Sequence, residues 1–333
     1  MLPIAMTTGA SSYILYHSFP SLHCLGPALS EIVTFLQPTL IFAMLFLTFC
    51  RIEPRDLKPH RWHWWLLLIQ GGVFLLLGGL AALLMKFACG YSENWLVLIQ
   101  SAMLCFICPT ATAAAVVTRK LGGDVPGITT YIVLINILAA FLIPLVIPMF
   151  QVGNEFGFWT AFLLIIAKVF PLLIIPCVCA WIVRYLFPKL HGRLLKYPDL
   201  AFYIWAVALT LAISVTTRSI MNSSMSVSLI LMMSLVSLIC CAMQFALGRY
   251  VGTTYKPRRK TSSPELDAAI EHRGKSVRAV TAGQSLGQKN TVFAIWLAYT
   301  FMTPETAIVG GLYSIWHNIY NSWQLNKAAK SAQ

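Results

Sequence analysis

The stretch GQSLGQKNTVFAIW, residues 283–296, places small and polar side chains and one lysine within an otherwise apolar segment. Lys289 lies at its centre, two positions after Gly287, and an apolar run resumes at 292–298. This pattern predicts a membrane helix that loosens at the glycines and restarts as a second half-helix. Because such breaks survive at membrane depth only when they are buried in protein or line a cavity, the stretch indicates a solute or ion site.

The composition around this stretch is that of a polytopic membrane protein. Of the 333 residues, 58% are hydrophobic and 11% are charged, and the mean hydropathy is +0.74. These values are too apolar for a soluble α/β domain. Since a span needs about 20 apolar residues, we divide the chain into ten candidate spans: 2–19, 30–50, 62–85, 95–118, 127–150, 158–183, 200–217, 226–247, 277–301 and 304–323. For the first span, a signal peptide is the alternative, but its charged leading region is missing.

The net charge of +13 is distributed as in a membrane protein rather than in a nucleic-acid-binding one. Twenty of the 24 Lys and Arg residues fall in loops on one side of the ten spans. Lys86 and Arg218 fall on the other side, and Lys168 and Lys289 lie within spans. The positive-inside rule therefore predicts that both termini are cytoplasmic. The expected partner is the lipid bilayer, with no nucleic acid and no obligatory protein partner.

A second interruption occurs in the fourth span, at Cys108–Thr112. Pro109 removes a backbone donor and clashes with the preceding helical turn, and the small residues that follow leave little side-chain bulk. The interrupted fourth and ninth spans correspond if the chain consists of two halves of five spans, 1–155 and 156–333. Because five is odd, the second half enters the membrane from the opposite side. Interrupted helices at matching positions of an inverted repeat point to a transporter binding site.

Several motifs resemble the bile acid:sodium symporter family, including its bacterial homologues. They are CPTAT at 108–112 with Val116, Val117, Thr118 and the Gly123-Asp124 turn, Lys168 followed by FPLLIIP, GQKNT at 287–291, and YSIWHN at 313–318. The resemblance implies an all-α polytopic membrane protein with ten transmembrane helices in two inverted five-helix repeats. Interrupted helices 4 and 9 would cross within a core domain of helices 3–5 and 8–10. Helices 1, 2, 6 and 7 would form a panel domain.

The chain departs from this family's pattern where the family binds sodium. Ala114 and Ala115 replace a Ser-Asn pair, Ser285 replaces a glutamate, and Lys289 replaces a glutamine. Gln70, in the third span, corresponds to a further family ligand. The resulting ion-site positions, which we expect to be degenerate, are Gln70, Ala114, Ala115, Ser285, Gln288 and Lys289. The loss of oxygen ligands argues against sodium coupling, and no other cofactor is expected.

Lys289 leaves several interpretations open. An ionised lysine at the membrane midplane costs on the order of 3 kcal/mol, so it must face water, a partner or a substrate. It could be a fixed cation in the place of sodium, a lysine that loses its proton during a transport cycle, or an anchor for an anionic substrate. Snorkelling to the membrane interface is the structural alternative. All 11 acidic residues fall in loops or at span ends, which argues against a carboxylate proton relay.

The predicted substrate-binding residues come from the two interruptions and from the sixth and tenth spans: Pro109, Thr110, Thr112, Lys289, Asn290, Thr291, His317, Asn318, Asn321 and Lys168. For Lys168, snorkelling or helix packing is the alternative. For the tenth-span residues, the alternative is a hydrogen-bond clamp against the ninth-span break.

These features predict a secondary active transporter of the inner bacterial membrane that works by alternating access. Half-helix N-termini and the two lysines favour a small organic anion, a carboxylate or sulfonate of bile-acid size or smaller. A metalloid-oxyanion efflux carrier of the same fold and a non-transporting membrane receptor are alternatives. An enzyme is not expected, because His60 and His63 form the only close histidine pair and lack acidic neighbours in a catalytic pattern. The Cys105–Cys108 pair lacks further ligands, so no metal site is expected.

Overall fold

A computed structural model describes residues 2–87, 93–150, 157–197, 200–254 and 264–331. Over these residues the regular structure is helical, apart from one isolated antiparallel bridge between Thr110 and Lys289. The first half of the chain forms the elements α1 (Leu2–Ser18), η1 (Pro20–Leu25), α2 (Gly26–Phe49), η2 (Pro54–Asp56), α3 (Arg61–Phe87), α4 (Glu93–Ile107), α5 (Ala113–Lys120), α6 (Val125–Val146) and η3 (Ile147–Phe150). The second half forms α7 (Phe158–Leu186), α8 (Pro188–Leu195), α9 (Leu200–Asn222), α10 (Val227–Thr254), α11 (Pro264–Gly287), α12 (Thr291–Phe301) and α13 (Pro304–Ser331).

Six helical segments of the described chain are long and apolar enough to cross a membrane. They are Pro20–Phe49, Arg61–Met85, Val125–Met149, Phe158–Leu186, Tyr203–Asn222 and Val227–Thr254. Two shorter apolar helices, Asn94–Ile107 and Thr291–Phe301, border the predicted interruptions. Together these helices indicate an integral membrane protein.

Both predicted interruptions are present. The fourth predicted span is divided into α4 and α5, and the ninth into α11 and α12. Pro109 follows α4, since its ring prevents a further turn of regular helix. Asn290 starts α12 as an N-cap, because its side-chain oxygen accepts from the Phe293 amide at 3.2 Å. The local sequence therefore dictates both the end of one half-helix and the start of the other.

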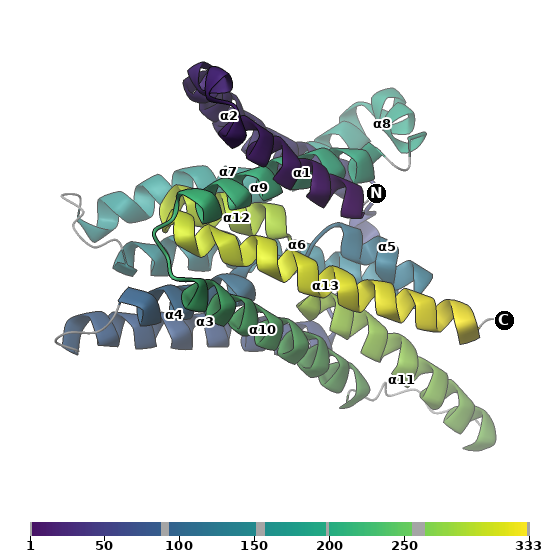
Figure 1. Cartoon of the computed structure of the whole chain (residues 1–333). Coiled ribbons are helices and arrows are strands. Elements are labelled where there is room, and N and C mark those ends of the chain that lie inside the picture. The colour runs from purple at the N-terminus through teal and green to yellow at the C-terminus, as the bar shows by residue number, and fades with distance from the viewer. Residues whose placement is uncertain (1, 88–92, 151–156, 198–199, 255–263, 332–333) are drawn as a thin grey trace.

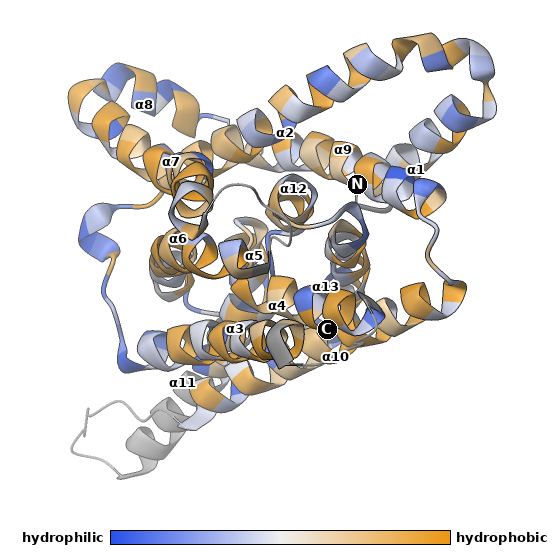
Figure 2. Cartoon of the chain, turned by 90° about the vertical axis from the view of Figure 1, so that its left-hand side faces the viewer, coloured by the Kyte–Doolittle hydropathy of each residue, from blue (hydrophilic) through white to orange (hydrophobic). Residues whose placement is uncertain are grey.

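The helices pack as two groups with α12 between them (Figure 2). In one group α9 packs against α1 and α2, and α2 packs against α7. In the other, α10 packs against α4, α11 and α13, and α3 packs against α4. Helix α12 contacts α13 on one side and α2 and α9 on the other, while α6 contacts both α3 and α7. Figure 1 shows the start of α1, the end of α13, α8 and the start of α11 at the same end of the helices.

Three segments differ from the sequence-based expectation or lie outside the description. The segment 248–276, which separates the predicted spans 226–247 and 277–301, is largely the end of α10 and the start of α11, with 255–263 outside the described residues. Its Ala, Glu, Lys and Arg residues are good helix formers, so the helices continue past the apolar boundary. Helix α8 was not anticipated, and it begins with Pro188 at its first position. The predicted domain boundary at 155 falls within 151–156, also outside the described residues.

Candidate functional site

The two interrupted helices meet through their non-helical backbone. The Ala111 amide donates to the Gln288 carbonyl at 2.9 Å, and the Asn290 amide donates to the Pro109 carbonyl at 2.8 Å. Such bonds are required because a buried main-chain group without a partner is costly in an apolar environment. The two breaks therefore supply partners for main-chain groups of one another.

Side chains are also exchanged between the two interruptions. Thr110 Oγ1 donates to the Ser285 carbonyl near the C-terminal end of α11, at 2.5 Å. Lys289 Nζ donates to the Phe106 carbonyl near the C-terminal end of α4, at 3.3 Å. The last carbonyls of a helix have no partner within the helix and carry partial negative charge. Each interruption therefore caps the half-helix of the other.

A glutamine on α3 supports the first interruption. Gln70 Nε2 donates to the Cys108 carbonyl at 2.9 Å, and its Oε1 accepts from the Tyr131 hydroxyl of α6 at 2.8 Å. Gln70 is fully buried. The predicted ion-site position on the third span thus contacts the break, with both ends of its amide engaged in protein hydrogen bonds.

We call the junction of the interruptions at Cys108–Thr112 and 287–291 the crossing. A second glutamine–tyrosine pair supports its other side. Gln244 Nε2 of α10 lies 3.2 Å from both the Cys105 carbonyl and the Tyr313 hydroxyl. The hydroxyl of Tyr313, on α13, donates to the Gly287 carbonyl at 2.8 Å. Gln244, Tyr131 and the hydroxyl of Tyr313 are not among the site residues predicted from the sequence. A polar side chain inside an apolar span was the available signal.

Lys289 lies inside the protein with almost no free volume around it. Its side chain is 1% exposed, so the snorkelling alternative does not hold. The adjacent space, lined by Cys105, Cys108, Thr291 and others, measures about 10 Å³, which is roughly enough for one water molecule. The Cys108 thiol donates to the Asn290 carbonyl at 3.3 Å. The crossing is therefore a packed junction.

The other predicted ion-site positions differ in whether their side chains offer an oxygen atom. Ala114 is fully buried and Ala115 half-buried, and neither side chain offers an oxygen. Ser285 Oγ and Gln288 Oε1 are buried and have no hydrogen-bond partner within the described chain. Two neutral oxygens are thus the only side-chain acceptors left open at these positions.

The tenth-span residues lie on α13 next to the crossing. His317 is buried, its ring meets Tyr313 edge-on with centroids 5.7 Å apart, and its Nδ1 has no partner among the described residues. Asn318 donates to the Ser314 carbonyl of its own helix at 2.6 Å. Asn321 Oδ1 accepts from Gln284 Nε2 of α11 at 3.0 Å. Asn321 therefore supports the predicted clamp against the ninth-span break.

The remaining predicted residues divide between the crossing and a separate location. Thr112 is buried and precedes α5, and Thr291 is buried and begins α12. Lys168 is exposed on α7, and its Nζ lies 5.8 Å from the centre of the Phe301 ring at the end of α12. The structure does not bring Lys168 to the crossing.

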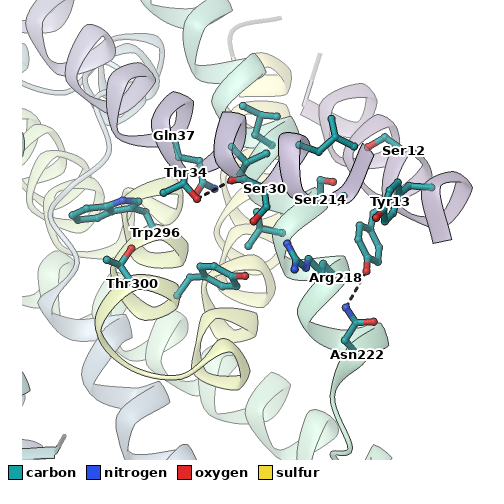
Figure 3. A pocket seen from close by; sticks show the side chains of 17 residues that line it. Ser12, Tyr13, Ser30, Thr34, Gln37, Ser214, Arg218, Asn222, Trp296 and Thr300 are labelled. Atoms are coloured by element: carbon teal, nitrogen blue, oxygen red, sulfur yellow. Dashed lines mark hydrogen bonds between the residues drawn. The ribbon is translucent and has the colours of Figure 1, made fainter. Parts of the chain in front are cut away.

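A much larger cavity, about 550 Å³, lies between α1, α2 and α9 on one side and α12 on the other (Figure 3). Hydroxyl and amide groups line much of it: Ser12, Ser30, Thr34, Gln37, Ser214, Asn222 and Thr300. Aromatic side chains contribute further walls: Tyr13, Tyr16, Trp296 and Tyr299. None of these residues was among the candidates from the sequence.

Two donors without acceptors face this cavity. Arg218 is the one charged side chain in its lining, and within the described chain it has no ion pair or hydrogen bond. Figure 3 shows it between Ser30 and the hydrogen-bonded Tyr13–Asn222 pair. Gln37 is 3% exposed, and its Nε2 has no acceptor in the described part of the chain. Since buried donors normally have partners, Gln37 favours a ligand with acceptor oxygens, and the half-buried guanidinium of Arg218 favours negative charge.

The sequence contains two signals for this cavity. Arg218 is one of two cationic residues on the less basic side of the predicted spans. Gln37 is a polar residue inside an apolar span, directly before Pro38.

A comparison with known protein families gives a match over most of the chain. The family model described as the SBF-like CPA transporter family (DUF4137) matches residues 12–328. No curated protein matches the chain. The matched range includes both interruptions and every residue that lines the cavity.

Proposed function

Since this chain belongs to the SBF-like CPA transporter family, we propose that it is a secondary active transporter that moves a small organic anion by alternating access. The observation that carries this proposal is the cavity of about 550 Å³ with Arg218 in its wall, which has no ion pair or hydrogen bond among the described residues. A guanidinium presents donors in a fixed fork that matches a carboxylate or sulfonate. An unpaired arginine facing a cavity in an apolar protein therefore favours an anionic ligand.

The size and lining of the cavity define the substrate class further. Its volume lies in the range of about 300–1,000 Å³ typical of small-molecule pockets. Trp296 and Tyr299 offer apolar faces, while Gln37 offers a donor that has no acceptor in the described part of the chain. The proposed substrate is a carboxylate or sulfonate with an apolar or aromatic body, of bile-acid size or smaller.

The proposed mechanism uses the two groups of helices as a panel domain and a core domain. The panel would consist of α1, α2, α7 and α9, and the core of α3–α6 and α10–α13. The position of the cavity supports this division, because the panel helices form one side and α12 the other. The matching pairs Gln70–Tyr131 and Gln244–Tyr313, one in each half of the chain, support inverted repeats at 1–155 and 156–333. A shift of the core against the panel would then close the cavity on one side and open it on the other.

The proposed location is the inner bacterial membrane with both termini in the cytoplasm. The excess of Lys and Arg on one side supports this orientation. The start of α1 and the end of α13 at the same end of the helices (Figure 1) support it as well.

Uptake into liposomes containing the purified protein tests the proposal. The probes are benzoate, benzenesulfonate and cholate, with benzamide as the neutral control. We expect saturable uptake of at least one anion, and a loss of roughly tenfold or more in Arg218→Gln, because a desolvated anion loses its charged partner. Arg193→Gln, an exposed arginine of α8, is the matched control and should transport normally.

Three outcomes would contradict the proposal. Unchanged anion uptake in Arg218→Gln would remove the cavity from the substrate path. Uptake of arsenite without uptake of any organic anion would favour the metalloid carrier. Saturable anion binding without accumulation would favour a receptor.

A further inference from the structure

Within the described residues, the crossing offers no cage of free oxygens for the coupling cation that the family resemblance implies. Eight main-chain carbonyls at the two interruptions accept from protein donors: Cys105, Phe106, Cys108, Pro109, Ser285, Gly287, Gln288 and Asn290. A cation that has lost its water needs a shell of oxygens in place of that water. Here the carbonyls are already used by amides, hydroxyls, a thiol and an ammonium.

The side-chain oxygens that remain do not make up the deficit. Among the described residues, four buried side-chain oxygens here have no partner, namely Gln244 Oε1, Gln284 Oε1, Ser285 Oγ and Gln288 Oε1, and all four are neutral. Ala114 and Ala115 bring no oxygen, and no carboxylate contacts the crossing among the described residues. The residues present therefore do not fit a sodium ion.

The crossing nevertheless contains a cationic group of its own. Lys289 Nζ lies 3.3 Å from the Phe106 carbonyl, where the partial negative charge at the end of α4 favours a cation. The sulfur-bearing side chains of Cys105 and Cys108 line the same small space. The backbone bridge between Thr110 and Lys289 fixes the base of the side chain.

We infer that the ammonium of Lys289 is the resident cation of this crossing and takes the role that a bound ion would have. Because this ammonium belongs to the chain, the crossing carries a cation without binding one from solution. The crossing is therefore held together without sodium, and transport needs no bound coupling cation. The conclusion about transport rests on the proposed function, whereas the conclusion about the crossing concerns the fold alone.

Thermal unfolding of the purified protein without any substrate tests the inference. We expect the same Tm in sodium chloride as in choline chloride of equal ionic strength. Lys289→Met keeps the length of the side chain and removes its charge, so it should lower Tm by ~5 °C or more. Lys168→Met is the matched control, because Lys168 is an exposed lysine of an apolar helix, and its Tm should not change.

A sodium-specific rise in the Tm of the unmodified protein would overturn the inference, as would a Lys289→Met variant as stable as the unmodified protein. If Lys289→Met does not fold, Tm is compared between sodium chloride and choline chloride for the unmodified protein and for Lys289→Arg, which keeps the charge. A sodium-specific rise in either protein would still overturn the inference. Because no substrate is present, a failed anion uptake experiment leaves this result standing, and a sodium-dependent Tm leaves the anion site standing.

Discussion

Two cationic side chains in apolar segments of this protein have opposite surroundings. Lys289 is enclosed, with about 10 Å³ of space beside it and a main-chain carbonyl as its acceptor. Arg218 faces a cavity of about 550 Å³ and has no protein acceptor within the described chain. An enclosed cation with a protein acceptor stabilises a junction, whereas an unpaired one in a cavity is available to a ligand. The two residues therefore have different roles.

Thr110 provides the residue-scale test of the exchanged caps. Thr110→Val keeps the shape of the side chain and removes the hydroxyl that donates to the Ser285 carbonyl. A buried carbonyl left without this donor costs about 1–3 kcal/mol, so we expect Tm to fall by several degrees. Thr39→Val is the control, because the Thr39 hydroxyl bonds within its own helix at an exposed position. Equal Tm values for the two variants would show that the cap on α11 has no energetic role.

At the level of the elements, the position of the ninth-span break depends on how closely α10 and α11 approach. A Cβ added at Gly248 would lie 2.4 Å from the Ala282 carbonyl oxygen, and one at Gly252 would lie 2.4 Å from the Arg278 carbonyl oxygen. Only glycine permits this contact between helix backbones, which is the small-residue packing common in membrane helices. A Cβ at Gly287 would likewise lie 2.4 Å from the Phe245 ring. These glycines bring the end of α11 to the crossing.

Gly248→Ala tests this packing. The added methyl group must push α10 and α11 apart, which we expect to cost about 1–3 kcal/mol and to lower Tm accordingly. Gly79→Ala on α3 is the matched control, since nothing lies within 4 Å of a Cβ built there. In a helix interior this control change should be neutral or slightly stabilising. If both variants unfold at the same temperature, the close approach of the helices has no energetic weight.

For the whole molecule, the cavity lies toward the end of the helices opposite the termini. Its lining includes Tyr16 near the end of α1, Gly26 at the start of α2 and Asn222 at the end of α9. Those helix ends lie away from the N and C labels in Figure 1. In the proposed orientation, which has both termini in the cytoplasm, the cavity would face the outside of the membrane.

Cys24 makes this orientation measurable without adding a new cysteine. It is the exposed cysteine among the free thiols of the described chain, and it belongs to η1, beside the cavity. In a Cys89→Ser background, a membrane-impermeant maleimide should label Cys24 in right-side-out vesicles and not in sealed inside-out vesicles. Cys24→Ser should abolish the labelling. The opposite pattern would reverse the proposed orientation.

The sequence by itself determined the helical class, the transporter family and both interruptions, because each of these depends on local pattern. Apolar runs, Pro109 and the polar group around Lys289 indicate where a helix must break, and Asn290 supplies the next cap. The positions of the breaks could be predicted because proline chemistry and side-chain polarity act within a few residues.

The tertiary structure decided which residues meet. The two exchanged caps join residues 175 and 183 positions apart, and the pattern of a single helix contains no information about such a partner. For the same reason Lys168, expected with the substrate residues, lies elsewhere, while Arg218 and Gln37 face the cavity. A sequence gives the charge and approximate depth of each side chain. Whether a buried charge meets a carbonyl or an open cavity depends on the packing of distant helices, and only the folded chain fixes that packing.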